Sequence, residues 1–75
     1  MKELVLFIAK QLAGHPDQIS VTETEQEGTI ELELCAAEED KGKIIGKQGK
    51  VIKAIRAVVQ AAAAQQNKRV IVEIN

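Results

Sequence analysis

The sequence predicts an α+β fold, built by one domain over residues 1–75 with elements in the order α-β-β-α-α-β. Three observations lead to this fold class: a helical apolar period at the N-terminus, two alternating segments joined by a glycine turn, and a long amphipathic run before a last β-branched segment. A hairpin followed by a two-helix crossover places the last strand parallel to the second. We therefore expect a three-stranded mixed sheet with three helices packed on one face.

The first expected element is an amphipathic helix over residues 2–13. Its apolar residues recur at three- and four-residue steps: Leu4, Phe7, Ile8 and Leu12. This spacing assigns Phe7, the only aromatic residue, to the core. Gly14 is placed to cap the helix, and Pro16 prevents its continuation.

A hairpin follows, because two segments with strand periodicity flank a turn at residues 26–28. Ile19 and Val21 mark the first strand. In the second strand Ile30, Leu32 and Leu34 alternate with acidic residues, which is typical of a half-buried strand whose other face is solvated. We interpret the glutamates of this half as that solvated face.

Two helices and a strand complete the chain. A short helix leads to Ile44 and Ile45 and ends at Gly46, with Asp40 as its candidate N-cap. The apolar residues of the next helix mark one broad face: Val51, Ile52, Ile55, Val58, Val59 and Ala62. The last strand is expected over residues 70–74.

The segment most informative about function is 41–56, KGKIIGKQGKVIKAIR, which carries six positive charges and no negative one. Gly46 and Gly49 lie three residues apart, so a loop between them can turn sharply and bring its backbone close to a ligand. The helix that follows presents unsatisfied N–H groups to that loop, and such helix ends favour phosphate. The pattern indicates a clamp for a phosphodiester backbone.

Charge is divided between the two halves of the chain, although the net charge is only −1. Residues 1–40 hold two bases against ten acids, a balance of −8, and residues 41–75 hold eight bases against one acid, a balance of +7. This asymmetry favours one directed contact with an anionic partner over unselective binding.

The residues of the basic segment also resemble a known family. Ile44-Ile45-Gly46-Lys47-Gln48-Gly49, followed by Ile52 and Ile55, is similar to the core of the KH domain, and residues 39–56 resemble the small bacterial single-KH proteins of the KhpA type. The resemblance implies a type II KH fold over residues 1–75 and a GxxG loop that clamps about four nucleotides. It also implies self-association into a homodimer, and pairing with a larger KH-containing protein of the KhpB type, also called Jag.

From these residues we predict a protein that binds single-stranded RNA and has no catalytic activity. Gly46 and Gly49 allow close backbone approach, and Lys47 and Gln48 contact phosphates. The charges that attract and orient the strand are those of Lys43, Lys50, Lys53 and Arg56. The aliphatic side chains expected under the bases are those of Ile44, Ile45 and Ile52. For Ile44 and Ile52, a place in the core remains an open alternative.

Other functions find little support in the sequence. Gly49-Lys50 is followed by Val51, and the position of the first Walker glycine holds Ile44, so a P-loop is excluded. His15 and Cys35 have no partners at metal-ligand or catalytic spacing, and we expect no cofactor and no metal. A single cysteine and the lack of a membrane-length apolar stretch favour a cytoplasmic protein without membrane contact. An RNA chaperone or post-transcriptional regulator fits best. The alternative is a dimerising interaction module in which RNA binding is secondary.

Overall fold

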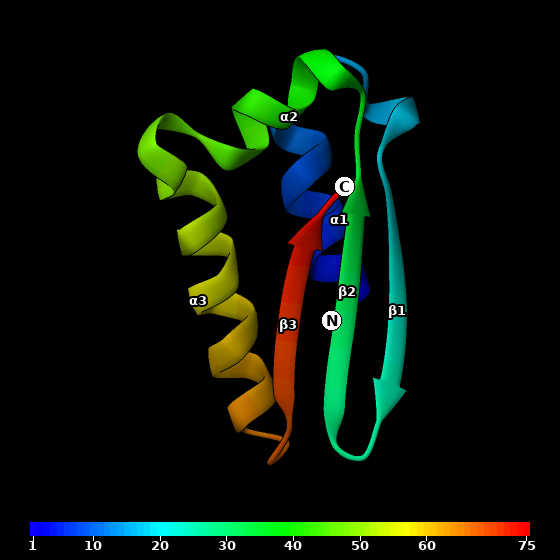
Figure 1. The fold of residues 1–75 in the computed structure, drawn as a ribbon, viewed down its shortest axis with the longest axis vertical. Helices are drawn as coiled ribbons and strands as arrows, with labels where there is room; N and C mark the ends of the chain where they lie inside the picture. The colour runs from blue at the N-terminus through cyan, green and yellow to red at the C-terminus, as the bar shows by residue number, and fades with distance from the viewer.

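The computed structural model describes residues 1–75 and contains a three-stranded sheet with helices against one face (Figure 1). The sheet order is β1-β2-β3, with β1 antiparallel and β3 parallel to β2. The expected order and the mixed sheet are therefore confirmed. No helix is long and apolar enough to cross a membrane. The elements are α1 (Lys2–Leu12), β1 (Ser20–Gln26), β2 (Thr29–Cys35), α2 (Glu38–Ile45), α3 (Lys50–Ala64) and β3 (Arg69–Ile74), with short 3-10 turns at Pro16–Gln18 and Lys47–Gly49.

The hairpin between β1 and β2 turns through two residues, Glu27 and Gly28. Both have positive φ, at 51° and 79°, and Gln26 pairs directly with Thr29. Two left-handed residues in succession match the right-handed twist of the flanking strands. The turn therefore fixes the register of the hairpin, in which the buried residues Val21 and Leu34 pair with each other.

The core lies between the sheet and the helices. Ile30, Leu32 and Leu34 of β2 are buried together with Val70 and Val72 of β3. The residues between them along β2 are exposed on the other face, as the alternation predicts. This part of the sequence was therefore interpreted correctly.

The buried face of α1 differs from the predicted one. Val5 and Ala9 are fully buried, whereas Phe7 is 63% exposed and Leu4 and Leu12 are each 37% exposed. The assignment of Phe7 to the core is wrong. At roughly 100° per residue, the buried face lies about 100° around the helix from the predicted stripe. Small side chains at Val5 and Ala9 fit where α1 packs closely against the rest of the core.

In α3 the predicted apolar face is correct in its centre and wrong at one edge. Ile52, Ile55 and Val59 are buried, and Ala63 joins them. Val58, which we expected on the same face, is 48% exposed. On the helical wheel it lies about 100° from Val59, on the flank of the buried stripe.

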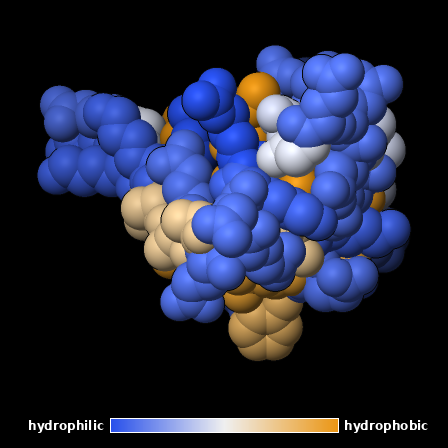
Figure 2. Space-filling view, turned by 90° about the horizontal axis from the view of Figure 1, so that it is seen from below, coloured by the Kyte–Doolittle hydropathy of each residue, from blue (hydrophilic) through white to orange (hydrophobic).

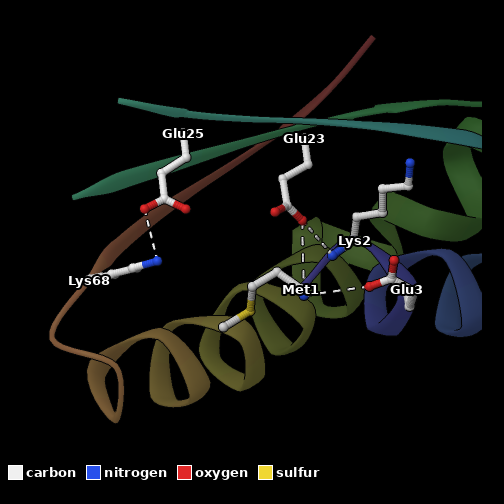
Figure 3. Close-up of polar contacts among 6 residues, drawn as sticks. All are labelled: Met1, Lys2, Glu3, Glu23, Glu25 and Lys68. Carbon is white, nitrogen blue, oxygen red and sulfur yellow. Dashed lines mark hydrogen bonds and ion pairs between the residues drawn. The ribbon is translucent and has the colours of Figure 1, made fainter. Parts of the chain in front are cut away.

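Two glutamates of β1 hold neighbouring segments in place rather than standing free in solvent (Figure 3). The carboxylate of Glu23 accepts the backbone N–H of Lys2 at 3.0 Å and lies 4.0 Å from the α-amino group of Met1. Glu25 pairs with the ammonium of Lys68 at 2.8 Å, just before β3. The interpretation of these two glutamates as a purely solvated face is corrected accordingly. β1, an edge strand, is thereby tied to α1 and to the turn after α3.

Candidate nucleic-acid interface

The loop begins at Gly46, where the backbone can accept no side chain. Gly46 has φ 77° and ψ 171°, and its N–H donates to the carbonyl of Gly42 at 2.8 Å to close α2. A Cβ at this position would lie 2.4 Å from Cγ2 and 2.9 Å from the backbone nitrogen of Val51. Both the left-handed backbone and the contact with α3 therefore require glycine here.

The other end of the loop is left-handed but open. Gln48 and Gly49 have φ 57° and 74°, and the N–H of Gly49 donates to the carbonyl of Gly46 at 3.1 Å. A Cβ on Gly49 would meet no atom closer than 3.9 Å. The two glycines thus serve different purposes: Gly46 lets the loop pack against α3, and Gly49 lets the chain turn into it.

Backbone amides at the tip of the loop are free to bind an acceptor. The N–H groups of Lys47 and Gln48 donate to no other group of the chain, and both side chains are exposed. They stand immediately before α3, a helix of 15 residues with no acidic residue in its first turn. Free amides at the positive end of a helix make a site for an anion.

The lysines of the basic segment divide into paired and unpaired groups. Lys41 lies 3.1 Å from Glu38, and Lys43 lies 3.8 Å from Asp40. Lys47, Lys50 and Lys53 are exposed and take part in none of the ion pairs, which are six in number. The Cε atom of Lys53 approaches to 4.0 Å of the point where a Cβ on Gly49 would stand, so its stem lies beside the loop. The unpaired positive charge is therefore concentrated at the loop and the first turn of α3.

Arg56 faces in a different direction from these three lysines. Its Nε and Nη2 donate to the carbonyl oxygen of Val72 at 3.2 and 3.0 Å, and the side chain is half-buried against β3. The guanidinium of Arg56, which we predicted to attract and orient the RNA strand, is thus held in one orientation by the sheet.

The three isoleucines predicted to line the base-binding surface are separated by burial. Ile44 is fully buried and Ile52 is 7% exposed, so both belong to the core, as the open alternative allowed. Ile45 is 36% exposed and is the one aliphatic residue of the three that reaches solvent beside the loop.

Asp40 is the residue whose role sequence reasoning missed. It is not the N-cap of α2, because Ala37 holds that position. Its carboxylate has no exposed surface and accepts the backbone N–H groups of Gly14 and His15, each at 2.9 Å. The hydrogen bond from Gly14 lowers the pKa of Asp40 most, against the raising effect of burial, and the charge of Lys43 also lowers it. Asp40 therefore anchors α2, and with it the start of the loop, to the turn after α1.

Comparison with known proteins shows which family this chain belongs to. The family model described as KhpA/KhpB, KH domain, matches residues 2–74. The chain belongs to the KhpA/KhpB family of KH domains. It is 55% identical over 74 residues to the RNA-binding protein KhpA of Clostridium acetobutylicum and to that of Clostridium perfringens, covering 99% of each protein and 99% of this chain. It is 39% identical over 74 residues to the RNA-binding protein KhpA of Listeria monocytogenes, covering 97% of that protein.

The resemblance drawn from residues 39–56 is thereby confirmed for nearly the whole chain. Gly46-Lys47-Gln48-Gly49, which has the GxxG spacing, lies between α2 and α3. The loop between α2 and α3 lies at the upper left of Figure 1. Ile44 and Ile52 belong to the core, and Arg56 is held against β3.

Proposed function

We propose that this KH domain binds single-stranded RNA at the Gly46–Gly49 loop and performs no catalysis. The observation that carries the proposal is the loop itself, in which two unpartnered backbone amides meet three unpaired lysines at the N-terminus of α3. The names of the relatives, RNA-binding protein KhpA, support the same ligand.

Each part of the site has a distinct task in this proposal. The backbone N–H groups and the side chains of Lys47 and Gln48 donate to the oxygens of the closest phosphate. The flanking glycines have no Cβ, so the backbone can approach that phosphate closely. Lys50 and Lys53 attract the neighbouring phosphates, and the exposed face of Ile45 supports a base. About four nucleotides are held in this way.

The decisive experiment reverses the charge of the loop. Lys47→Asp combined with Gln48→Asp places two carboxylates where the phosphate must approach, and both side chains lie outside the core. The same dipeptide occurs on α1, where Lys10 and Gln11 are also exposed, so Lys10→Asp with Gln11→Asp is a matched control with an equal change in net charge.

We expect the loop variant to lose binding to a single-stranded RNA of about ten nucleotides and the α1 variant to keep it, with similar far-UV circular dichroism for both. Equal losses in the two variants would show that binding is unselective electrostatic adhesion. Full affinity of the loop variant would refute the assignment of the loop.

Exposed apolar side chains on α1 and α3 favour a second candidate function, association with another protein chain. Phe7 and Val58 are 63% and 48% exposed, and Leu4 and Leu12 add to the apolar surface of α1. Figure 2 shows apolar residues gathered at the lower edge of a surface that is otherwise largely hydrophilic. We propose that this surface supports a homodimer, or a heterodimer with a larger KH protein of the KhpB type.

The two functions are compatible, because joining two binding sites raises avidity without new RNA contacts. Phe7→Glu and Val58→Glu should each lower the mass measured by light scattering from dimer to monomer, and RNA affinity per site should persist. A monomeric wild-type chain at all concentrations would remove the homodimer from the proposal. In either assembly we propose a cytoplasmic RNA chaperone or post-transcriptional regulator.

A further inference from the structure

Arg56 stands at the unpaired edge of the sheet. β3 is an edge strand of the sheet. The backbone N–H groups of Arg69 and Asn75 donate to β2, so the odd-numbered residues of β3 face β2. The even-numbered residues between them point their backbone N–H and C=O groups away from β2. Val72 is one of these residues, and its outward carbonyl accepts both Nε and Nη2 of Arg56. The guanidinium is therefore fixed between α3 and β3.

Part of this guanidinium is still available. Of the five N–H donors that an arginine carries, Val72 engages one on Nε and one on Nη2. The remaining donors include the pair on Nη1 and Nη2 that forms the end of the fork. No carboxylate pairs with Arg56, and its side chain is only half-buried. A planar ligand with two neighbouring acceptors fits this free end.

The position of Arg56 relative to the loop suits a base rather than the clamped phosphate. It lies seven residues beyond Gly49 on α3, which at about 1.5 Å per residue is roughly 10 Å along the helix axis. Four stacked nucleotides at about 3.4 Å each cover that distance. The phosphates already have Lys47, Lys50 and Lys53, which are mobile point charges, whereas the fixed fork of Arg56 is suited to a directional contact.

We propose that Arg56 reads the edge of a guanine in the bound strand and so gives the protein a base preference. Guanine presents two adjacent acceptors, O6 and N7, to an arginine fork. Adenine places a donor next to N7, so it cannot accept both N–H groups. This inference rests on the proposed RNA binding at the loop and adds the property of selectivity to it.

The test compares RNA heptamers that differ at one base. The first set is seven adenosines and the same strand with a single guanosine at each internal position in turn. The second replaces the best guanosine by 7-deazaguanosine, which lacks the N7 acceptor. In the wild-type chain we expect about tenfold tighter binding for guanosine at one position, and loss of most of this preference with the deaza base.

Two variants separate base reading from general attraction. Arg56→Lys keeps the charge and removes the fork, so the ratio of affinities for the two strands should fall toward one. Lys53→Gln should weaken binding to both strands and leave the ratio unchanged, because its contact is with phosphate. Absence of a preference in the wild-type chain, or a preference that survives Arg56→Lys, overturns the inference while leaving RNA binding intact.

Other outcomes are also informative. If no heptamer binds, the proposed function fails and this inference fails with it. If the Arg56→Lys variant does not fold, the inference is tested by the affinity of the wild-type chain for the 7-deazaguanosine strand. Equal binding of the guanosine and 7-deazaguanosine strands overturns the assignment.

Discussion

Replacing each glycine of the loop by alanine should separate the two glycines by their cost in stability. At Gly49 the new Cβ meets no atom closer than 3.9 Å, so only the left-handed backbone at φ 74° is penalised, by about 1–2 kcal/mol. At Gly46 the same penalty applies, and the Cβ also lies 2.4 to 2.9 Å from three atoms of Val51. The backbone nitrogen among them cannot rotate away, so overpacking adds about 1–3 kcal/mol.

The expected loss for Gly46→Ala is therefore about 2–5 kcal/mol, against about 1–2 kcal/mol for Gly49→Ala. A chain of 75 residues has a total stability of about 4–11 kcal/mol, so the first change removes a large share of it. Urea unfolding followed by far-UV circular dichroism measures both losses directly.

Gly42 supplies the control within the same segment. It lies inside α2, has no positive φ, and its added Cβ would meet nothing within 4 Å. Gly42→Ala should stabilise the chain by about 0.5–1 kcal/mol, because alanine loses less backbone entropy in a helix. Equal losses for Gly46→Ala and Gly49→Ala would refute the reasoning from the Val51 contact, and a loss for Gly42→Ala would show that α2 is less regular than described.

Three further predictions concern the ligand and the acid response. With three unpaired lysines at the site, a plot of the logarithm of the binding constant for single-stranded RNA against the logarithm of the salt concentration should have a slope of about −2, since each neutralised phosphate contributes about −0.7. A slope near zero would exclude these lysines as contacts. Single-stranded RNA should bind more tightly than duplex RNA of equal length at one salt concentration, because one loop approaches one backbone; tighter duplex binding would contradict the loop model. The pKa of Asp40 is lowered below its ordinary 3.8, so its contribution to stability is present at neutral pH and lost as pH falls below about 4. Asp40→Asn should therefore lower the melting temperature at pH 7 and reduce its dependence on pH in acid, and an unchanged melting temperature at pH 7 would contradict the anchoring role.

The hairpin and the loop were predictable because their signals are local. Alternation in β2 follows from a period of two along a strand, and the left-handed turn needs the glycine that the sequence shows at position 28. The loop is likewise defined by Gly46 and Gly49 themselves. In each case the residue that makes the pattern is also the residue that forms the structure.

The face of α1 could not be predicted from its period. Leu4, Phe7 and Leu12 are more apolar than Ala9, so a prediction from the helical period places them in the core. Such a prediction takes account of hydrophobicity but not of how well a side chain packs against its neighbours. Burial of Val5 and Ala9 depends on how closely α1 approaches the core, which is a property of the assembled layers.

The roles of Asp40 and Arg56 depend on partners distant in the chain. The donors to Asp40 lie 25 and 26 residues away, and the acceptor of Arg56 lies 16 residues away. Near the start of a helix an aspartate fits an N-cap equally well, and on a basic helix an arginine fits a solvated charge. The fold alone reveals which contact each side chain makes.

The geometry of Gly46 and Gly49 also allows the two residues between them to change with little effect on the rest of the fold. The turn is closed by backbone hydrogen bonds and by the contact of Gly46 with α3, and the side chains at positions 47 and 48 are exposed outside the core. A library randomised at these two positions should therefore yield folded proteins in most members, with ligand preference as the property that varies. Proline and β-branched residues at position 48 are the exceptions, because the backbone there has a φ of 57°. New recognition could therefore be selected at these two positions without first making the protein more stable.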